Sequence, residues 1–263
     1  MNDERKRELL QGLIGDLCAE RGVEMPRLED TAELWHAFRA LVNTREAAPA
    51  PSDMLARQDE LLRGMVAGAG IRSAREAARS AIDPRLLLWR GDITTLAVDA
   101  IVNAANSGMT GCWTPNHLCI DNAIHTFAGM QLRAECARIM EAQGHAEPTG
   151  QAKITGAWNL PARHVIHTVG PIANGRPTEE DGRLLAQCYE SCLDLAAEHG
   201  LRSMAFCCIS TGVFGFPQEE AAPIAVAAVR RWLGAHASDM TVVFDVFTDT
   251  DERLYADLLA IER

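Results

Sequence analysis

Apolar residues in the first part of the chain recur at intervals of three and four, which is the spacing of one helix face. They are Leu9, Leu10, Leu13, Ile14 and Leu17, followed by Leu34, Phe38 and Leu41. The Ala- and Pro-rich stretch 46–52 predicts an extended connection, and a further helix is expected over 54–66. Because short amphipathic helices need a partner surface, residues 1–84 are expected to form a helical extension packed on the remainder of the chain.

Beyond Pro84, short apolar runs alternate with helical segments. Buried strands are expected at 86–89, 100–102, 165–169, 204–209 and 242–247, and helices at about 122–143, 182–198, 218–235 and 251–261. This alternation predicts an α/β domain over residues 85–263, with helices covering a largely parallel sheet. Ligands of such sheets bind beyond the carboxyl ends of the strands, so the loops that come directly after the strands are where chemistry is expected.

Composition fits this organisation and argues against several partners. The 263 residues are 48% hydrophobic and 23% charged, which is typical of soluble globular proteins with one full domain and an appendage. A net charge of −11, with Lys6 and Lys153 as the only lysines, argues against nucleic-acid binding. No apolar run approaches the ~20 residues of a membrane span, and the charged start lacks a signal-peptide pattern. We therefore expect a cytoplasmic protein without a membrane partner, and a monomer by default.

Two of the loops that come after strands offer polar groups to a ligand. In Gly91-Asp92-Ile93-Thr94 the carboxylate of Asp92 can accept a hydrogen bond from an amino group. In Asn103-Ala104-Ala105-Asn106 two carboxamides flank small residues, so a sugar can approach the backbone closely. Capping of a turn or short helix by Asp92 and ordinary turn chemistry by the asparagines explain the same residues.

A third loop, Ser210-Thr211-Gly212-Val213-Phe214-Gly215-Phe216, leaves the strand expected at 204–209 and precedes a helix. Its glycines permit close backbone approach, and its backbone N–H groups can hold a diphosphate without any lysine. Phe214 or Phe216 can stack on a ring. The alternative is a glycine-rich turn without a ligand.

Together the three loops, in this order and spacing, resemble the macrodomain family, whose members bind ADP-ribose. The resemblance covers about residues 85–263 and implies a three-layer α/β/α fold with a mixed, largely parallel central sheet. It implies that Asp92 contacts the adenine amino group with Ile93 beside it, and that the Asn103 and Asn106 loop holds the distal ribose. The diphosphate would be bound by Ser210, Thr211, Gly212, Val213 and Phe214.

The chain departs from ordinary macrodomains after the asparagine loop, where many members have a run of glycines. Here Cys112, His117 and Cys119 lie within eight residues. Thiolate and neutral imidazole are preferred zinc ligands, and three protein ligands with an open position are typical of catalytic zinc. The alternative is that the cysteines are buried small hydrophobes and His117 a polar loop residue. The other cysteines have helical or strand spacing and are expected outside the metal site: Cys18, Cys136, Cys188, Cys192, Cys207 and Cys208.

This loop beside the distal-ribose site resembles the zinc-dependent branch of the macrodomains, whose members also carry a helical extension and remove ADP-ribose from proteins. Asp121 resembles the aspartate that hydrolytic macrodomains place near the scissile bond, although Asp is also a good helix N-cap. Asp121 and Asn106 are therefore the candidate catalytic residues. His125, one helical turn after Asp121, is expected to pack beneath the loop.

The leading hypothesis is a zinc-dependent hydrolase acting on the ADP-ribose moiety of mono-ADP-ribosylated proteins, with acidic side chains as the linkage. A binding module that recognises ADP-ribose without cleaving it uses the same adenine and diphosphate loops. A deacetylase of O-acetyl-ADP-ribose uses the same pocket. In a further alternative, zinc only stabilises its loop.

Overall fold

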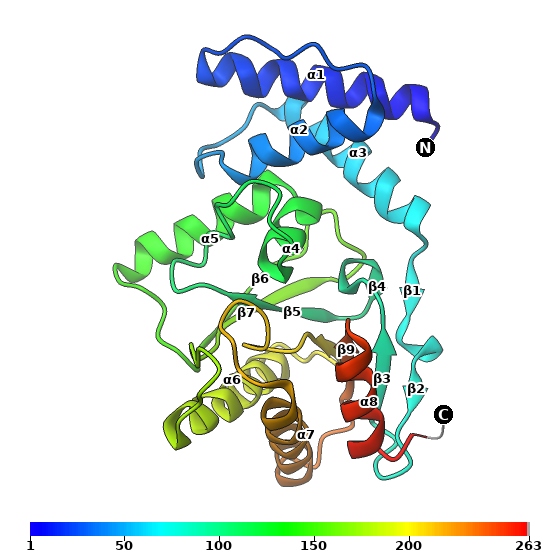
Figure 1. Cartoon of the computed structure of the whole chain (residues 1–263), viewed down its shortest axis with the longest axis vertical. Coiled ribbons are helices and arrows are strands. Elements are labelled where there is room, and N and C mark those ends of the chain that lie inside the picture. Colours follow the sequence, from blue (N-terminus) through cyan, green and yellow to red (C-terminus); the bar gives the residue numbers. More distant parts are fainter. Residues whose placement is uncertain (262–263) are drawn as a thin grey trace.

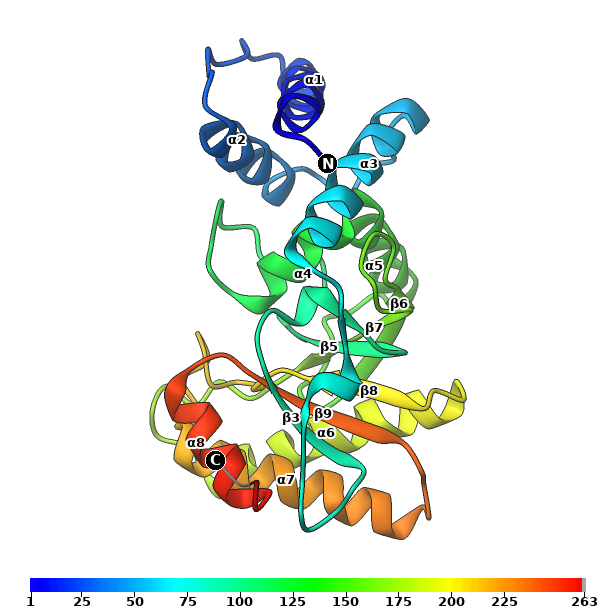
Figure 2. The same cartoon turned by 90° about the vertical axis from the view of Figure 1, so that its right-hand side faces the viewer.

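The computed structural model describes residues 1–261 and begins with three helices, which pack as a separate layer on the rest of the chain (Figures 1 and 2). They are α1 (Asp3–Arg21), α2 (Thr31–Asn43) and α3 (Ser52–Ala69). The residues that showed helical spacing form their shared core, with Leu10, Ile14 and Phe38 fully buried. The helices expected in this region, and the non-helical connection before α3, are confirmed.

A seven-stranded sheet forms the centre of the remaining chain. Its strand order is β2-β3-β9-β8-β5-β7-β6, with parallel pairing throughout except at the two edges, where β2 and β6 run antiparallel to their neighbours. The strands are β2 (Ala78–Arg79), β3 (Leu86–Arg90), β5 (Ala100–Ala105), β6 (Ala152–Gly156), β7 (His164–Val169), β8 (Ser203–Phe206) and β9 (Thr241–Val246). Short β1 (Arg72–Ser73) and β4 (Leu96–Ala97) form a separate parallel pair, and η1 (Ala74–Glu76) and η2 (Ile93–Thr95) are 3₁₀ helices.

Helices cover both faces of this sheet (Figure 1). On one face lie α4 (Ile120–Ala128) and α5 (Met130–Gln143), and on the other α6 (Glu179–Glu198), α7 (Gln218–Ala235) and α8 (Asp249–Leu258). Apolar residues of α4 to α8 and of the strands form one buried cluster. The α/β/α fold with a mixed, largely parallel sheet is therefore confirmed. In the described part of the chain, no helix has the length and apolar character needed to cross a membrane.

A single helix was expected over 122–143, but the structure has two helices there, α4 and α5, which are separated at Gly129. Gly129 has a φ of +99°, and a Cβ there would lie 2.6 Å from Nε2 of Gln58. Gln58, from α3, accepts a hydrogen bond from the backbone N–H of Met130 at 2.9 Å. The chain therefore passes between the two helices in a conformation that favours glycine, at a position closely packed against α3, and the signal for the break in the sequence is a single glycine.

Edge strands and strand ends also differ from expectation. The antiparallel strand β6 was not predicted, and β2, which precedes Pro84, hydrogen-bonds to β3. Strand β8 ends at Phe206, so Cys207 and Cys208 come after the strand instead of lying in it. Strand β9 ends at Val246, which leaves Phe247 outside it with 78% of its surface exposed.

Candidate functional site

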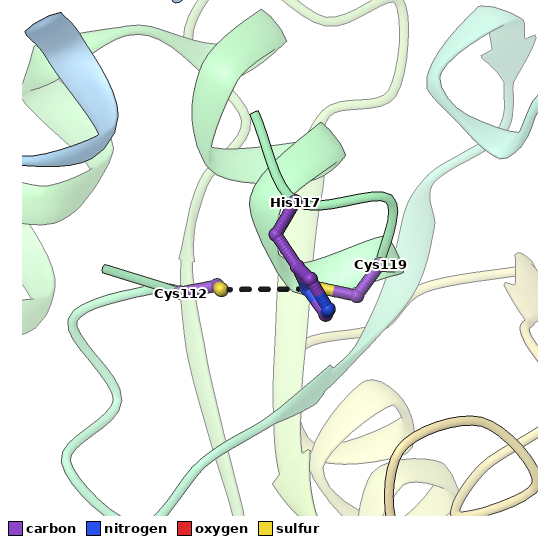
Figure 3. Close-up of side chains that lie close together, drawn as sticks. All are labelled: Cys112, His117 and Cys119. Atoms are coloured by element: carbon purple, nitrogen blue, oxygen red, sulfur yellow. Dashed lines mark hydrogen bonds between the residues drawn. The ribbon is translucent and has the colours of Figure 1, made fainter. Parts of the chain in front are cut away.

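The loop between β5 and α4 brings Cys112, His117 and Cys119 together (Figure 3). Their ligand atoms all lie within 4.8 Å of one another, and Sγ of Cys112 is 3.6 Å from Nδ1 of His117. All three residues are half-buried. Two sulfurs and one imidazole in a loop are a donor set that suits zinc, and a three-residue set leaves a coordination position for another ligand. The residues present therefore fit the metal that the sequence implied.

Cys119 also begins helix α4. Its Sγ accepts a hydrogen bond from the backbone N–H of Asn122 at 3.4 Å, which makes Cys119 the N-cap. Burial and the neighbouring Cys112 raise the pKa of Cys119 to about 12. The thiol therefore keeps its proton at neutral pH unless a cation replaces it, and metal binding would release that proton.

The segment 103–106 was expected to be a loop, but Asn103 lies within β5 and is fully buried, so only Asn106 comes after the strand. Asp121 lies where this end of β5 meets the Cys-His-Cys loop. Its Oδ1 accepts a hydrogen bond from Nδ2 of Asn103 at 2.8 Å, and its Oδ2 accepts one from Nδ2 of Asn106 at 3.1 Å. Burial raises the pKa of Asp121 to about 6, against the opposing effect of the two carboxamides. The interpretation of Asp121 as a helix N-cap is wrong, since Cys119 is the cap and the Asp121 carboxylate binds the asparagines instead.

Beneath this carboxylate is a second, fully buried group that the sequence did not reveal: His125, Cys136 and His167, whose ligand atoms also lie within 4.8 Å of one another. His125 packs under the loop as expected, since a Cβ on Gly111 would lie 2.7 Å from its Cγ. The three residues come from α4, α5 and β7, so no local spacing could show their proximity.

His167 already has hydrogen-bonding partners within the fold. Its Nδ1 is 3.1 Å from Nδ2 of Asn103, and its Nε2 is 3.0 Å from Oγ1 of Thr155 and 3.8 Å from Sγ of Cys136. Burial lowers the pKa of His167 to about 3, so the ring is neutral at physiological pH. We interpret His167 as the support that holds Asn103, and through it Asp121, in place.

Replacing His167 with Gln should make stability less sensitive to acid. In the unfolded chain His167 binds a proton below pH 6.5, whereas in the folded chain it does so only near pH 3. As the pH falls below 6.5, protonation therefore favours the unfolded chain, and the free energy of unfolding decreases. This loss amounts to at most ~1.4 kcal/mol per pH unit. Urea unfolding at pH 7.5 and 5.0 should show a smaller difference for His167→Gln than for wild type. The exposed His199→Gln variant is the control, and equal acid losses in all three proteins would contradict the prediction.

The end of β3 carries the expected adenine loop. Asp92 is exposed and caps η2, because its Oδ1 accepts hydrogen bonds from the backbone N–H of Thr94 at 2.9 Å and from the Thr94 hydroxyl at 2.6 Å. The side chain of Ile93 is buried in the core and its carbonyl accepts a hydrogen bond from the N–H of Leu96, which leaves its backbone N–H for a ligand. The capping interpretation of Asp92 thus holds, and it leaves Oδ2 for another partner.

Two neighbours of this loop were missed because they lie in an apolar run. Asp245, on β9, is 6% exposed and its Oδ1 has no hydrogen-bond partner; burial, together with Asp92, raises its pKa. Phe247 comes after β9 at the position where β9 pairs with the last residues of β3, and it is exposed. An exposed aromatic ring beside the adenine loop is a candidate stacking partner.

The expected diphosphate loop, 210–216, is joined to the loop that comes after β7. The backbone carbonyl of Phe214 accepts hydrogen bonds from the N–H groups of Ala173 at 2.9 Å and Asn174 at 3.0 Å. Ser210 is buried with a φ of +65°, whereas Val213 is 71% exposed. Of the two rings considered for stacking, Phe216 is excluded because it is 2% exposed and belongs to the core. Thr211 and Phe214 are half-buried, and Gly212 is exposed.

These loops come after β3, β5, β8 and β9, which are parallel neighbours, so they share one edge of the sheet. Comparison with known proteins agrees with this arrangement. Residues 102–225 match the family described as Macro domain. A protein-ADP-ribose hydrolase of Treponema medium is 51% identical over 261 residues, covering 98% of each chain. The chain belongs to the macro domain family.

Other relatives extend this comparison. A protein-ADP-ribose hydrolase of Staphylococcus aureus (strain MSSA476) is 47% identical over 257 residues, covering 94% of both chains. Among solved macro domain structures, that of Trypanosoma brucei in complex with ADP-ribose is 32% identical, with a TM-score of 0.63, and covers 84% of this chain and 94% of its own. The Oceanobacillus iheyensis macrodomain with MES bound is 39% identical, with a TM-score of 0.60, and covers 66% and 90%.

In this macro domain, Gly170→Ala should disturb the loop at 210–216. A Cβ on Gly170 would lie 2.1 Å from Oγ of Ser210 and 2.9 Å from Cγ2 of Ile209, so the side chains at the start of this loop would have to shift. We expect a loss of stability of ~1–3 kcal/mol from overpacking and at least tenfold weaker ADP-ribose binding, measured by thermal unfolding and calorimetry. Gly212→Ala is the control for stability, because nothing lies within 4 Å of its added Cβ. Unchanged ADP-ribose binding in Gly170→Ala would contradict a role of this loop in binding.

Proposed function

We propose that this macro domain is a zinc-dependent hydrolase that releases ADP-ribose from mono-ADP-ribosylated protein side chains, with acidic residues as the linkage. Its relatives at 47–51% identity are protein-ADP-ribose hydrolases, and they are matched over nearly the whole chain. This likeness includes the helical extension as well as the α/β/α domain.

The observation that carries the proposal is the junction of two groups of side chains. Nδ2 of Asn106 donates hydrogen bonds both to Oδ2 of Asp121 at 3.1 Å and to the backbone carbonyl of Gly111 at 3.0 Å. Gly111 directly precedes Cys112, and Asp121 comes two residues after Cys119. The candidate metal ligands and the candidate carboxylate are therefore held at one point, where a module that only binds ADP-ribose has no need of both.

Each group has a chemical task in this proposal. Zinc, when bound by Cys112, His117 and Cys119, supplies a Lewis acid that lowers the proton affinity of a neighbouring oxygen. Asp121, ionised above its pKa of about 6, accepts a proton from the attacking water, and Asn103 and Asn106 orient its carboxylate.

The remaining loops bind the substrate without taking part in the chemistry. Backbone N–H groups of 210–214 hold the diphosphate, and Asp92 receives the adenine amino group. Because these contacts lie away from the scissile bond, their task is to place the distal ribose against Asp121.

The decisive test is release of free ADP-ribose from a protein mono-ADP-ribosylated on an acidic side chain, with zinc quantified in the same sample. Release with about one zinc per chain is the expected result. Tight ADP-ribose binding and bound zinc without release would overturn the acidic linkage or the activity itself. The same sample would then be offered O-acetyl-ADP-ribose, where acetate release would assign the pocket to deacetylation.

A further inference from the structure

Helix α2 of the extension lies against the candidate metal loop and contributes a charged side chain to it. Nη2 of Arg39 donates hydrogen bonds to the backbone carbonyl of His117 at 2.9 Å and to Oδ1 of Asn122 at 2.8 Å, and its Nε donates to the same Oδ1 at 3.2 Å. His117 is a candidate ligand, and Asn122 is the residue whose N–H donates to Cys119. One guanidinium therefore ties together the two ends of the segment from His117 to the first turn of α4.

One helical turn further along α2, Asn43 holds the residue before His117. Its Oδ1 accepts a hydrogen bond from the backbone N–H of Asn116 at 3.0 Å, and its Nδ2 donates to Oγ1 of Thr126 at 3.0 Å. Asn116 has a φ of +56°, a left-handed conformation that needs support from its surroundings, and its own Nδ2 donates to the backbone carbonyl of His36 at 3.2 Å. Asn43 is 1% exposed, so these bonds are shielded from water.

Arg133 makes a second connection, since it donates to the backbone carbonyls of Asn43 at 2.8 Å and Cys112 at 3.5 Å.

We infer that α2 is part of the metal site, with Arg39 and Asn43 as positioning residues that hold His117 and Cys119 in ligating geometry. This inference rests on the proposed zinc site. Partners of metal ligands typically contribute ~10–100-fold to metal affinity. The extension is then a component that preorganises the zinc loop, and its removal would impair the metal site even though none of its residues is a candidate ligand.

The test is the zinc dissociation constant of the full chain, measured by competition with a chromogenic chelator. Arg39→Ala should weaken zinc binding by ~10–100-fold. Arg39→Lys, which keeps the charge but loses the forked donor geometry, should fall between this variant and wild type, and Arg39→Gln should lie closer to Ala. Arg7→Ala is the matched control, because Arg7 lies in the same extension and makes an exposed ion pair with Asp3. ADP-ribose binding by zinc-free protein should change less than about twofold in every variant, since its loops do not contact α2 through Arg39.

The possible results distinguish this inference from the proposed zinc-dependent function on which it rests. If wild type binds no zinc, the metal in the proposed function fails, and the inference with it. If wild type binds zinc and Arg39→Ala binds it equally tightly, only the inference is overturned. If Arg39→Ala weakens ADP-ribose and zinc binding in parallel, Arg39 has a general structural role and the inference is also overturned. If Arg39→Ala does not fold, the zinc dissociation constants of wild type, Arg39→Lys and Arg39→Gln are compared instead, and their order decides in the same way.

Discussion

Asp121→Asn is expected to lower the rate of ADP-ribose release by ~10²–10⁴-fold, the usual contribution of a positioned acid or base. The amide cannot accept the proton of the attacking water. Both carboxylate oxygens of Asp121 receive N–H groups, from Asn103 and Asn106, so the carboxylate is already oriented in the ligand-free fold. Single-turnover release from a mono-ADP-ribosylated protein, at saturating enzyme and pH 8, measures the chemical step directly.

The variant must be separated from a folding defect. An Asn at 121 would turn its NH₂ group toward another carboxamide NH₂, at a cost of ~1–3 kcal/mol for an unsatisfied buried donor. Thermal unfolding, zinc content and ADP-ribose binding are therefore measured on the same preparation, with the exposed Glu141→Gln on α5 as a matched acid-to-amide control. Wild-type turnover in Asp121→Asn with normal zinc content would remove Asp121 from the chemical step.

Periodicity predicted the elements whose burial is regular along the chain. Helix α7 was predicted over its observed span, and the strands β3, β5, β7, β8 and β9 were each located, because strands covered on both faces are continuous apolar runs. Strand β6 was missed because its residues are mostly half-buried, which gives no such run. The break at Gly129 was missed because a single glycine is a weak signal inside a helical pattern, and the side chain of Gln58 that packs against it comes from a distant helix.

In the candidate site, too, contacts within one short segment could be predicted, whereas contacts between distant segments could not. Cys112, His117 and Cys119 belong to one short loop, so their spacing alone could predict that they meet. Asn106 and Asp121 lie at the two ends of the same connection, between β5 and α4, so their contact also joins residues that are close in the sequence. Arg39 is 78 residues from His117 along the chain and 83 from Asn122. Contacts between residues so far apart cannot be predicted from a local sequence pattern. Asp245 was not recognised as a site residue because it stands among apolar residues in the sequence of β9.

Cys119→Ser is expected to lose zinc and activity together while keeping the fold. A neutral hydroxyl is a poor zinc ligand compared with a thiolate, so zinc affinity should fall by more than ~100-fold, beyond the effect of changing an outer partner. Serine is also a preferred N-cap, so it can take over the hydrogen bond that Sγ of Cys119 accepts from the N–H of Asn122. Metal content, thermal unfolding of the zinc-free protein and ADP-ribose release are the three measurements.

Comparison of these three quantities decides what the metal does. Cys18→Ala, which removes a buried thiol of α1 that lies outside the loop, controls for the loss of a cysteine. A catalytic metal predicts that Cys119→Ser and chelated wild type unfold close to the temperature of zinc-loaded wild type, and that both still bind ADP-ribose but no longer release it from the modified protein. A metal that only stabilises its loop predicts instead that unfolding temperature and activity fall in step. Release at the wild-type rate by Cys119→Ser without bound metal would exclude zinc from the reaction and leave hydrolysis to Asp121 and its two asparagines.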